Sequence, residues 1–186
     1  MIKPHPSWDR LLKVAQEIDP AAHIAGGAVR DYLLGKTIRD HDLFTTASTV
    51  GLVSHTLFPY QAPDNYEGPE YFVAFPDIAA SIEFSDIRNG RVNIIGLNSP
   101  YGMRSNVNRF NFGLNRVGYD GKEFYITPEF VRDLQNKTFT LRGGLTTEQL
   151  RLNIEKWEFF LQSKYPDYRL VLPPEYETTV DEEIPF

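Results

Sequence analysis

Hydrophobic and polar residues alternate at helical spacing near both ends of the sequence. Residues 7–19 predict an amphipathic helix with its apolar positions on one face, and Ser7 is suited to cap it. Residues 146–165 predict a longer helix, which Thr146 and Gln149 begin with a capping box. The apolar positions of this second helix are Leu150, Ile154, Trp157 and Leu161.

Shorter elements are expected between these two helices. Apolar runs bounded by glycine, proline and polar residues predict several strands, and two of the intervening segments predict helices. A mixed α/β or α+β domain follows from this order of elements. The expected strands are 22–25, 40–46, 71–75, 80–88, 91–95 and a pair within 112–126 around the Asp120–Gly121 turn; the expected helices are 28–35 and 47–58; residues 59–70 and 98–111 are expected to be irregular.

Composition narrows the class of protein. The chain has 186 residues, which fits one domain or one domain with a small appendage, and 41% hydrophobic residues allow a real core. The absence of cysteine excludes disulfides and cysteine-ligated zinc. No apolar run is of membrane-spanning length and the first residues lack the apolar stretch of a signal peptide, so we expect a cytoplasmic protein with no membrane partner. The sequence does not indicate an oligomeric state.

Charge argues against a general affinity for nucleic acid. The formal net charge is −6, so long-range attraction to nucleic acid is not a property of the whole molecule, although local basic clusters can still hold a phosphate. The last residues, 173–186, are acidic and rich in proline, which predicts a loose or strap-like tail.

A glycine pair, Gly26–Gly27, stands between an expected strand and an expected helix. Free backbone N–H groups at a helix start carry the positive end of the helix dipole and suit a phosphate, which glycine allows to come close. Arg30, one turn into the helix, is placed to add a charge-assisted bond to the same anion. Two glycines alone indicate little more than a tight strand-to-helix turn, which is the favoured interpretation of this feature by itself.

Two aspartates, Asp40 and Asp42, follow with one residue between them. Side chains alternate along a strand, so Asp40 and Asp42 point to one face while His41 and Leu43 point to the other. Two neighbouring carboxylates repel each other unless a cation lies between them, and oxygen ligands of this kind suit Mg²⁺. The alternative is a strand end with two solvated acids.

A third acid is expected on another strand. In "SIEFSDIR", Glu83 shares its face with two serines, whereas Asp86 falls on the opposite face with Ile82 and Phe84. We therefore favour Glu83 as the third metal ligand and treat Asp86 as its competitor. The alternative for Glu83 is a surface position on an edge strand.

The stretch "GGAVRDYLLGKTIRDHDLFTT" resembles the head-domain signature of the bacterial-type poly(A) polymerases and tRNA CCA-adding nucleotidyltransferases. "IEFSDIR", "NRFNFGLN", "FVRDLQNKTF" and "TEQLRLNIEKWEFF" are similar to later segments of that family, so the resemblance covers roughly residues 8–165. It implies a nucleotidyltransferase-like (DNA polymerase beta-like) head with a mixed sheet flanked by helices at residues 1–145. A neck-like helix would follow at 146–165 and a strap or tail at 166–186. The family normally continues through further helices that grip tRNA, and this sequence stops soon after the first neck helix.

The resemblance also implies roles for single residues. Asp40, Asp42 and Glu83 would be catalytic and hold Mg²⁺, with Mn²⁺ as an alternative. Gly26, Gly27 and Arg30 would hold the triphosphate, and Asp31 would fix the turn or the ribose. The remaining residues implied in nucleotide binding are Arg88, Arg109, Asn115 and, for the base, Glu148 and Arg151.

The activity implied is transfer of a nucleoside monophosphate from an NTP, ATP or CTP by preference, to an acceptor hydroxyl by a two-metal mechanism. The acceptor is left open between an RNA 3′ end, a protein and a small molecule. A non-catalytic nucleotide-binding module is the third alternative. It is favoured by Phe110 and Asn111, which stand where the family has an arginine and an aspartate, whereas the intact acids argue against it. Thr147 and Glu148 stand where the family has a glutamate and an aspartate, which implies an altered base preference.

Overall fold

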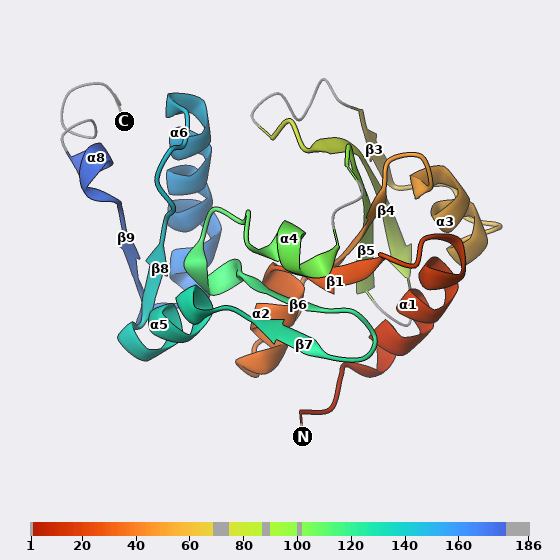
Figure 1. The fold of residues 1–186 in the computed structure, drawn as a ribbon, viewed down its shortest axis with the longest axis horizontal. Helices are drawn as coiled ribbons and strands as arrows, with labels where there is room; N and C mark the ends of the chain where they lie inside the picture. Colours follow the sequence, from red (N-terminus) through yellow and green to blue (C-terminus); the bar gives the residue numbers. More distant parts are fainter. Residues whose placement is uncertain (1, 69–74, 87–89, 100–101, 178–186) are drawn as a thin grey trace.

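The computed structural model describes residues 2–68, 75–86, 90–99 and 102–177. Within them, seven strands form one mixed sheet in the order β3-β4-β5-β2-β1-β6-β7, and β8 and β9 form a separate parallel pair. Helices flank the large sheet, so the predicted α+β fold class is confirmed (Figure 1). None of the described helices is both long and apolar enough to cross a membrane.

The elements follow one another along the chain in the order shown by the colours of Figure 1. They are α1 (Pro6–Ile18), β1 (His23–Ala25), α2 (Gly27–Leu33), β2 (Asp40–Thr46), α3 (Val50–Leu57), β3 (Asn65–Glu67), β4 (Ile78–Asp86), β5 (Gly90–Leu97), α4 (Met103–Val107), η2 (Gly113–Asn115), β6 (Val117–Tyr119), β7 (Phe124–Ile126), α5 (Pro128–Asn136), β8 (Thr138–Thr140), α6 (Thr147–Lys156), η3 (Trp157–Leu161), α7 (Gln162–Lys164), β9 (Arg169–Val171) and α8 (Pro174–Glu177).

One face of the sheet packs against α1 and α3. Trp8 on α1 is fully buried, and its indole N–H donates to Nδ1 of His41 on β2 at 2.9 Å. Leu43, two residues along β2, is fully buried in the same core. The predicted helix 7–19 is confirmed, but the predicted cap is wrong: His5 is the N-cap, and its ring nitrogen accepts from the backbone N–H of Ser7, because α1 begins at Pro6.

The opposite face of the sheet changes character along β2. Asp40 and Asp42 occupy its first half, whereas Phe44 is buried with Met103 and Val107 of α4. α4 lies inside the segment 98–111, which was expected to be irregular, so that prediction is wrong there. A five-residue helix is too short to produce a periodic signal. The helix therefore closes one end of this face and leaves the acidic end open.

Other boundaries also differ from the prediction. The segment 59–70 was expected to be a loop, yet it contains the three-residue strand β3. Residues 71–74 of the expected strand 71–75 lie outside the described residues. The strands around the Asp120–Gly121 turn are confirmed as β6 and β7. Neither α5 nor the β8–β9 pair was predicted from the sequence.

The helix that Thr146 begins is confirmed, including its capping box with Gln149. It continues through a π-helical turn, η3, into α7, and we call residues 147–164 the C-terminal helix. Trp157 and the following Tyr165 pack on Phe139 of β8. β9 and α8 lie in the segment expected to be a strap or tail, of which residues 178–186 are outside the described residues.

Asp133 organises the junction between α5 and β8. It is completely buried, and its carboxylate accepts hydrogen bonds from the Thr138 hydroxyl and from the backbone N–H and hydroxyl of Thr140. Gly113 approaches this carboxylate so closely that an added Cβ would lie 2.6 Å from Oδ2. The absence of a side chain at Gly113 is therefore needed for this packing.

Candidate functional site

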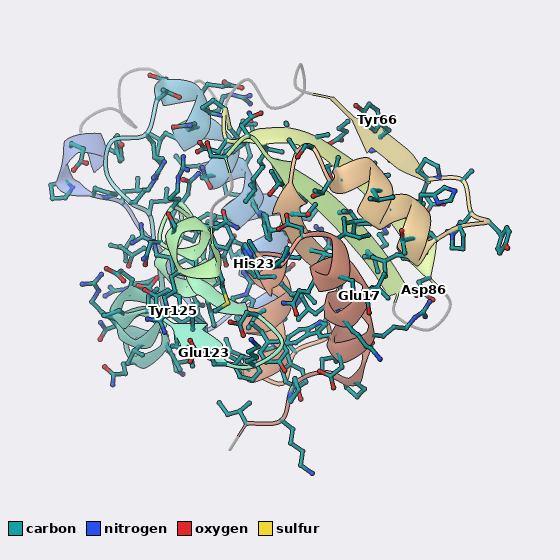
Figure 2. The ribbon with its side chains drawn as sticks, turned by 45° about the vertical axis from the view of Figure 1, so that its right-hand side comes forward. Glu17, His23, Tyr66, Asp86, Glu123 and Tyr125 are labelled. Atoms are coloured by element: carbon teal, nitrogen blue, oxygen red, sulfur yellow. The ribbon has the colours of Figure 1, made fainter. Side chains whose placement is uncertain are left out.

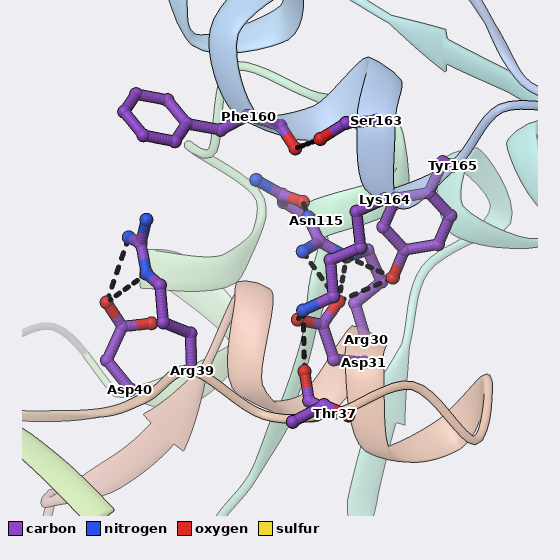
Figure 3. A network of polar contacts seen from close by, with 10 residues as sticks. All are labelled: Arg30, Asp31, Thr37, Arg39, Asp40, Asn115, Phe160, Ser163, Lys164 and Tyr165. Atoms are coloured by element: carbon purple, nitrogen blue, oxygen red, sulfur yellow. Dashed lines mark hydrogen bonds and ion pairs between the residues drawn. The ribbon is translucent and has the colours of Figure 1, made fainter.

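A cleft of about 780 Å³ lies between the acidic end of the sheet and the C-terminal helix. Figure 3 shows this region, with Asp40 and Arg39 on one side and Phe160, Ser163 and Lys164 of the C-terminal helix facing them. The residues that line the cleft come from α2, β2 and its approach, β5, η2 and the C-terminal helix. They are Gly27, Arg30, Asp31, Arg39, Asp40, Asp42, Asn93, Asn115, Leu152, Glu155, Lys156, Phe159, Phe160, Leu161, Ser163 and Lys164.

The two aspartates of β2 both line this cleft. The Arg39 side chain donates two hydrogen bonds to Asp40 Oδ2, at 3.0 and 3.1 Å. His41, which alternates with them, is buried on the opposite face against Trp8. The alternation of side chains predicted for this strand is therefore confirmed.

Asp42 belongs to a row of polar side chains that runs across the sheet. It pairs in register with Asn93 of β5, which in turn pairs with Glu83 of β4. The Asn93 amide donates to Asp42 Oδ1 at 2.9 Å. Since partners in register point to the same face, Glu83 lies on the same face as Asp42. Asp86 lies on the other face, where it contacts Arg10 of α1 at 3.9 Å.

Glu83 is nevertheless two strands away from Asp42, which corresponds to about 9–10 Å between their backbones. Its carboxylate lies 3.7 Å from the Arg91 guanidinium, and it does not line the cleft. Among the described residues, no group of three or more histidine, cysteine or acidic side chains is close enough to hold a metal. A role for Glu83 as third ligand requires its side chain to reach across Asn93, and that role stays a prediction.

The electrostatics of the cleft disfavour two unaccompanied carboxylates. Burial raises the pKa of Asp42 to about 6, and repulsion from Asp40 adds to the increase. The surrounding protein lowers the pKa of Lys156, whereas attraction to Asp42 and Asp40 opposes that change. Because the Lys156 side chain is partly exposed to solvent, the surrounding protein removes only part of the water around its ammonium group. Its ammonium group is thus a cation close to both aspartates.

The pair of aspartates fits a divalent cation. Burial is the main cause of the raised pKa of Asp42, and a cation between Asp40 and Asp42 would offset the repulsion that adds to it. Carboxylate oxygens are the ligands that Mg²⁺ takes in proteins. Mg²⁺ is commonly bound by one or two carboxylates together with water and substrate phosphates. The donor set therefore suits Mg²⁺ without demanding a third protein ligand.

At the glycine pair, Gly26 has a φ of +78°, a left-handed conformation that a side chain would strain. An added Cβ there would lie 3.2 Å from the Phe110 ring, so the ring packs directly on the turn. Gly27 begins α2 and lines the cleft. Phe110, the departure from the family pattern, is thus a packing residue against Phe44.

Arg30 and Asp31 are held in a network that joins α2 to the C-terminal helix (Figure 3). Arg30 is only 4% exposed; it pairs with Asp31 and donates to Asn115 and to the Tyr165 hydroxyl. Asp31 also accepts from the Tyr165 hydroxyl and the Lys164 ammonium. Arg30 and Asn115 both line the cleft, but the guanidinium already has partners inside the protein.

Glu148 and Arg151 lie outside the cleft, although they were predicted to face the nucleotide. Arg151 pairs with Glu148 at 2.7 Å and with Glu155 one turn further on. The cleft receives the next part of the helix instead. Phe159 and Phe160 line it and are 71% and 57% exposed.

Arg109 and Arg88 are the remaining residues that were predicted to bind the nucleotide. Arg109 forms an ion pair with Asp77 and does not line the cleft, and Arg88 lies outside the described residues. The residues of the cleft that the sequence reasoning missed are Arg39, Asn93, Leu152, Glu155, Lys156, Phe159, Phe160, Leu161, Ser163 and Lys164. Most of them fall at helical spacing on one face of the predicted helix 146–165, which is a signal that the sequence does contain.

Residues 7–137 match the model of one protein family, described as Gabija anti-defense 2 family protein. The chain belongs to this family. The match covers all seven strands of the large sheet, the glycine pair and both aspartates of the cleft. No curated protein matches the sequence.

Solved structures similar to this chain include tRNA-processing and CCA-adding enzymes. One, described as a tRNA-processing enzyme, has a TM-score of 0.63 at 19% identity, over 91% of this chain and 45% of that chain. The CCA-adding enzyme of Bacillus stearothermophilus in complex with CTP has a TM-score of 0.62 at 15% identity, over 97% and 44%. The CCA-adding enzyme of Thermotoga maritima complexed with tRNA has a TM-score of 0.60 at 15% identity, over 96% and 41%.

At these identities the likeness concerns the fold. The fold is similar to that of these enzymes, as the resemblance in sequence implied, whereas the family whose model matches is Gabija anti-defense 2 rather than the poly(A) polymerases and CCA-adding enzymes. The chain spans less than half the length of these enzymes.

Proposed function

We propose that this protein is a Mg²⁺-dependent nucleotidyltransferase that moves a nucleoside monophosphate from an NTP, ATP or CTP by preference, to an acceptor hydroxyl. The observation that carries the proposal is the position of Asp40 and Asp42, side by side on one strand face in a cleft that also contains the start of α2 at Gly27. Mn²⁺ is the alternative metal.

In this proposal the acidic residues of the cleft bind the metal and the basic residues bind the phosphates. Asp40 and Asp42 would hold the metal, which when bound neutralises the triphosphate and favours ionisation of the acceptor hydroxyl. Arg39, Lys156 and Lys164 supply positive charge around them for the phosphates of the NTP. Asn93 orients Asp42 through its 2.9 Å hydrogen bond. Positioning and charge neutralisation are the main sources of rate in this class of reaction.

Arg30 has a different role in this proposal from the one that the family pattern implies. Its guanidinium already binds Asp31, Asn115 and Tyr165 inside the protein. Arg30 would therefore mainly hold the wall of the cleft in place. Direct contact between its guanidinium and the triphosphate would require one of these hydrogen bonds to break.

For the acceptor, a protein hydroxyl is favoured over an RNA 3′ end. The net charge of −6 gives no general attraction to RNA. The family name gives its members an action against the defence called Gabija. Attachment of a nucleotide to a protein of that defence would be one such action.

The proposal is tested by incubating the protein with each of the four NTPs, labelled at the α-phosphorus, and Mg²⁺ or Mn²⁺. Three acceptor sources are compared: tRNA, a desalted extract of bacteria that carry Gabija, and no addition. Label retained on macromolecules is then digested with ribonuclease or with protease, which separates an RNA acceptor from a protein acceptor. Asp42→Asn is expected to abolish transfer.

The matched control is Glu17→Gln, which makes the same carboxylate-to-amide change on the exposed surface of α1 (Figure 2). It is expected to transfer as the parent does. Transfer by a folded Asp42→Asn protein at the parent rate would refute the assignment of the cleft.

A further inference from the structure

Two exposed phenylalanines are the least expected feature of the cleft. Phe159 and Phe160 are 71% and 57% exposed, whereas the neighbouring Trp157 and Leu161 on the opposite side of the same turn are buried. Large apolar side chains are usually covered when a helix packs on a domain. Here two adjacent rings line a cleft whose other lining residues are mostly charged or polar.

The Phe160 ring already faces a planar cation. The guanidinium carbon of Arg39 lies 5.5 Å from its centroid, and Arg39 also binds Asp40. In Figure 3 the Phe160 ring extends from the C-terminal helix and lies above Arg39 and Asp40. A flat π-system placed on this ring would therefore lie next to the aspartates that carry the proposed chemistry.

From these positions we infer that Phe159 and Phe160 form an aromatic platform on which the base of the incoming NTP stacks. This inference rests on the proposed function and names the part of the site that holds the base. Bases stack on aromatic side chains and on arginine planes, and this contact is tolerant of sequence because every base has a π-face. The phosphates would then lie toward Arg39, Lys156 and Lys164, which share the cleft with the platform.

The platform gives the base a different contact from the one that the sequence predicted. Glu148 and Arg151 were expected to read its edge, but they lie outside the cleft and pair with each other. Stacking binds all four bases, whereas edge recognition discriminates between them. The platform therefore predicts that all four NTPs depend on the two rings.

The experiment is isothermal titration calorimetry of MgATP, MgCTP and inorganic tripolyphosphate with the parent and three variants, without any acceptor. The double variant Phe159→Leu/Phe160→Leu is expected to bind both nucleotides about 5- to 150-fold more weakly, the range found for removal of a base-stacking ring. Its affinity for tripolyphosphate, which has no base, should stay at the parent value. The ring-retaining variant Phe159→Tyr/Phe160→Tyr should keep the parent affinity for all three ligands.

Tyr66→Leu is the matched control, because Tyr66 is 58% exposed but lies on β3, away from the C-terminal helix (Figure 2). Unchanged nucleotide affinity in the leucine pair would overturn the inference and leave the proposed function standing. Equal loss of tripolyphosphate, or loss of nucleotide affinity in the tyrosine pair, would also overturn it. A parent protein that binds none of the three ligands would overturn the proposed function and the inference together.

Discussion

Replacing Tyr165 by phenylalanine tests the network that joins α2 to the C-terminal helix. Tyr165 is 1% exposed, and its hydroxyl accepts from Arg30 Nε at 3.0 Å and donates to Asp31 at 2.5 Å. Burial raises the pKa of this hydroxyl above its ordinary value, so it keeps its proton near neutral pH. The change Tyr165→Phe removes only this oxygen and leaves the ring on Phe139 in place.

The size of the loss follows from the partners that remain. A hydrogen bond to a charged group contributes about 1.5–3 kcal/mol. Two are lost, but Arg30 and Asp31 keep their bond to each other, so we expect a total loss near the value of one, about 1.5–3 kcal/mol. For a chain of this size, that corresponds to a melting temperature lower by about 3–12 °C.

The assay is urea denaturation followed by circular dichroism, with a thermal melt as the second readout. Tyr60→Phe is the matched control, since Tyr60 is fully exposed, and its stability should equal that of the parent. A loss below about 0.5 kcal/mol in Tyr165→Phe, the range of ordinary surface changes, would refute the view that this network holds the wall of the cleft.

Two further predictions concern the rest of the fold. Burial alone would raise the pKa of Asp19, but hydrogen bonds from Thr46 and its neighbours outweigh burial and bring the pKa below its ordinary value of 3.8. The ionised carboxylate therefore stabilises the fold above pH 3.8, and this stabilisation is lost as the pH falls through the folded pKa. Asp19→Asn should cost about 1–3 kcal/mol at pH 7 and should flatten the fall in stability below pH 4, measured by urea denaturation at several pH values. Gly113→Ala should lower stability by about 1–3 kcal/mol because its Cβ would collide with Asp133, whereas Gly51→Ala, which meets nothing within 4 Å, should leave the melting temperature unchanged or higher; equal melting temperatures for the two variants would contradict this packing.

Much of the fold could be predicted because its signals are local. The strand 40–46, the turn at Asp120–Gly121 and the capping box of Thr146 each depend on residues close in sequence, and all three are found. The elements that were not predicted, all except α5, are too short to give such a signal. α4 has five residues, and β3, β8 and β9 have three each, so none is long enough for a periodic pattern to stand out.

In the candidate site, too, features that depend on local sequence could be predicted, whereas features that depend on strand order and packing could not. The common face of Asp40 and Asp42 follows from the alternation of a strand, which the sequence contains directly. The distance of Glu83 depends on strand order, because β5 lies between β4 and β2, and one sequence does not reveal that order. The resemblance in sequence implied that Glu148 and Arg151 bind the base. In the structure, the C-terminal helix packs so that Phe159 and Phe160, further along it, line the cleft instead.

The central claim is that the cleft transfers a nucleotide and not a terminal phosphate. The most direct measurement compares ATP labelled at the α-phosphorus with ATP labelled at the γ-phosphorus, under the same Mg²⁺ and with the same bacterial extract. We expect the acceptor to take up only the α label, the γ label to leave as pyrophosphate in equal amount, and Asp42→Asn to stop both. Uptake of the γ label, or release of pyrophosphate that Asp42→Asn does not change, would contradict it.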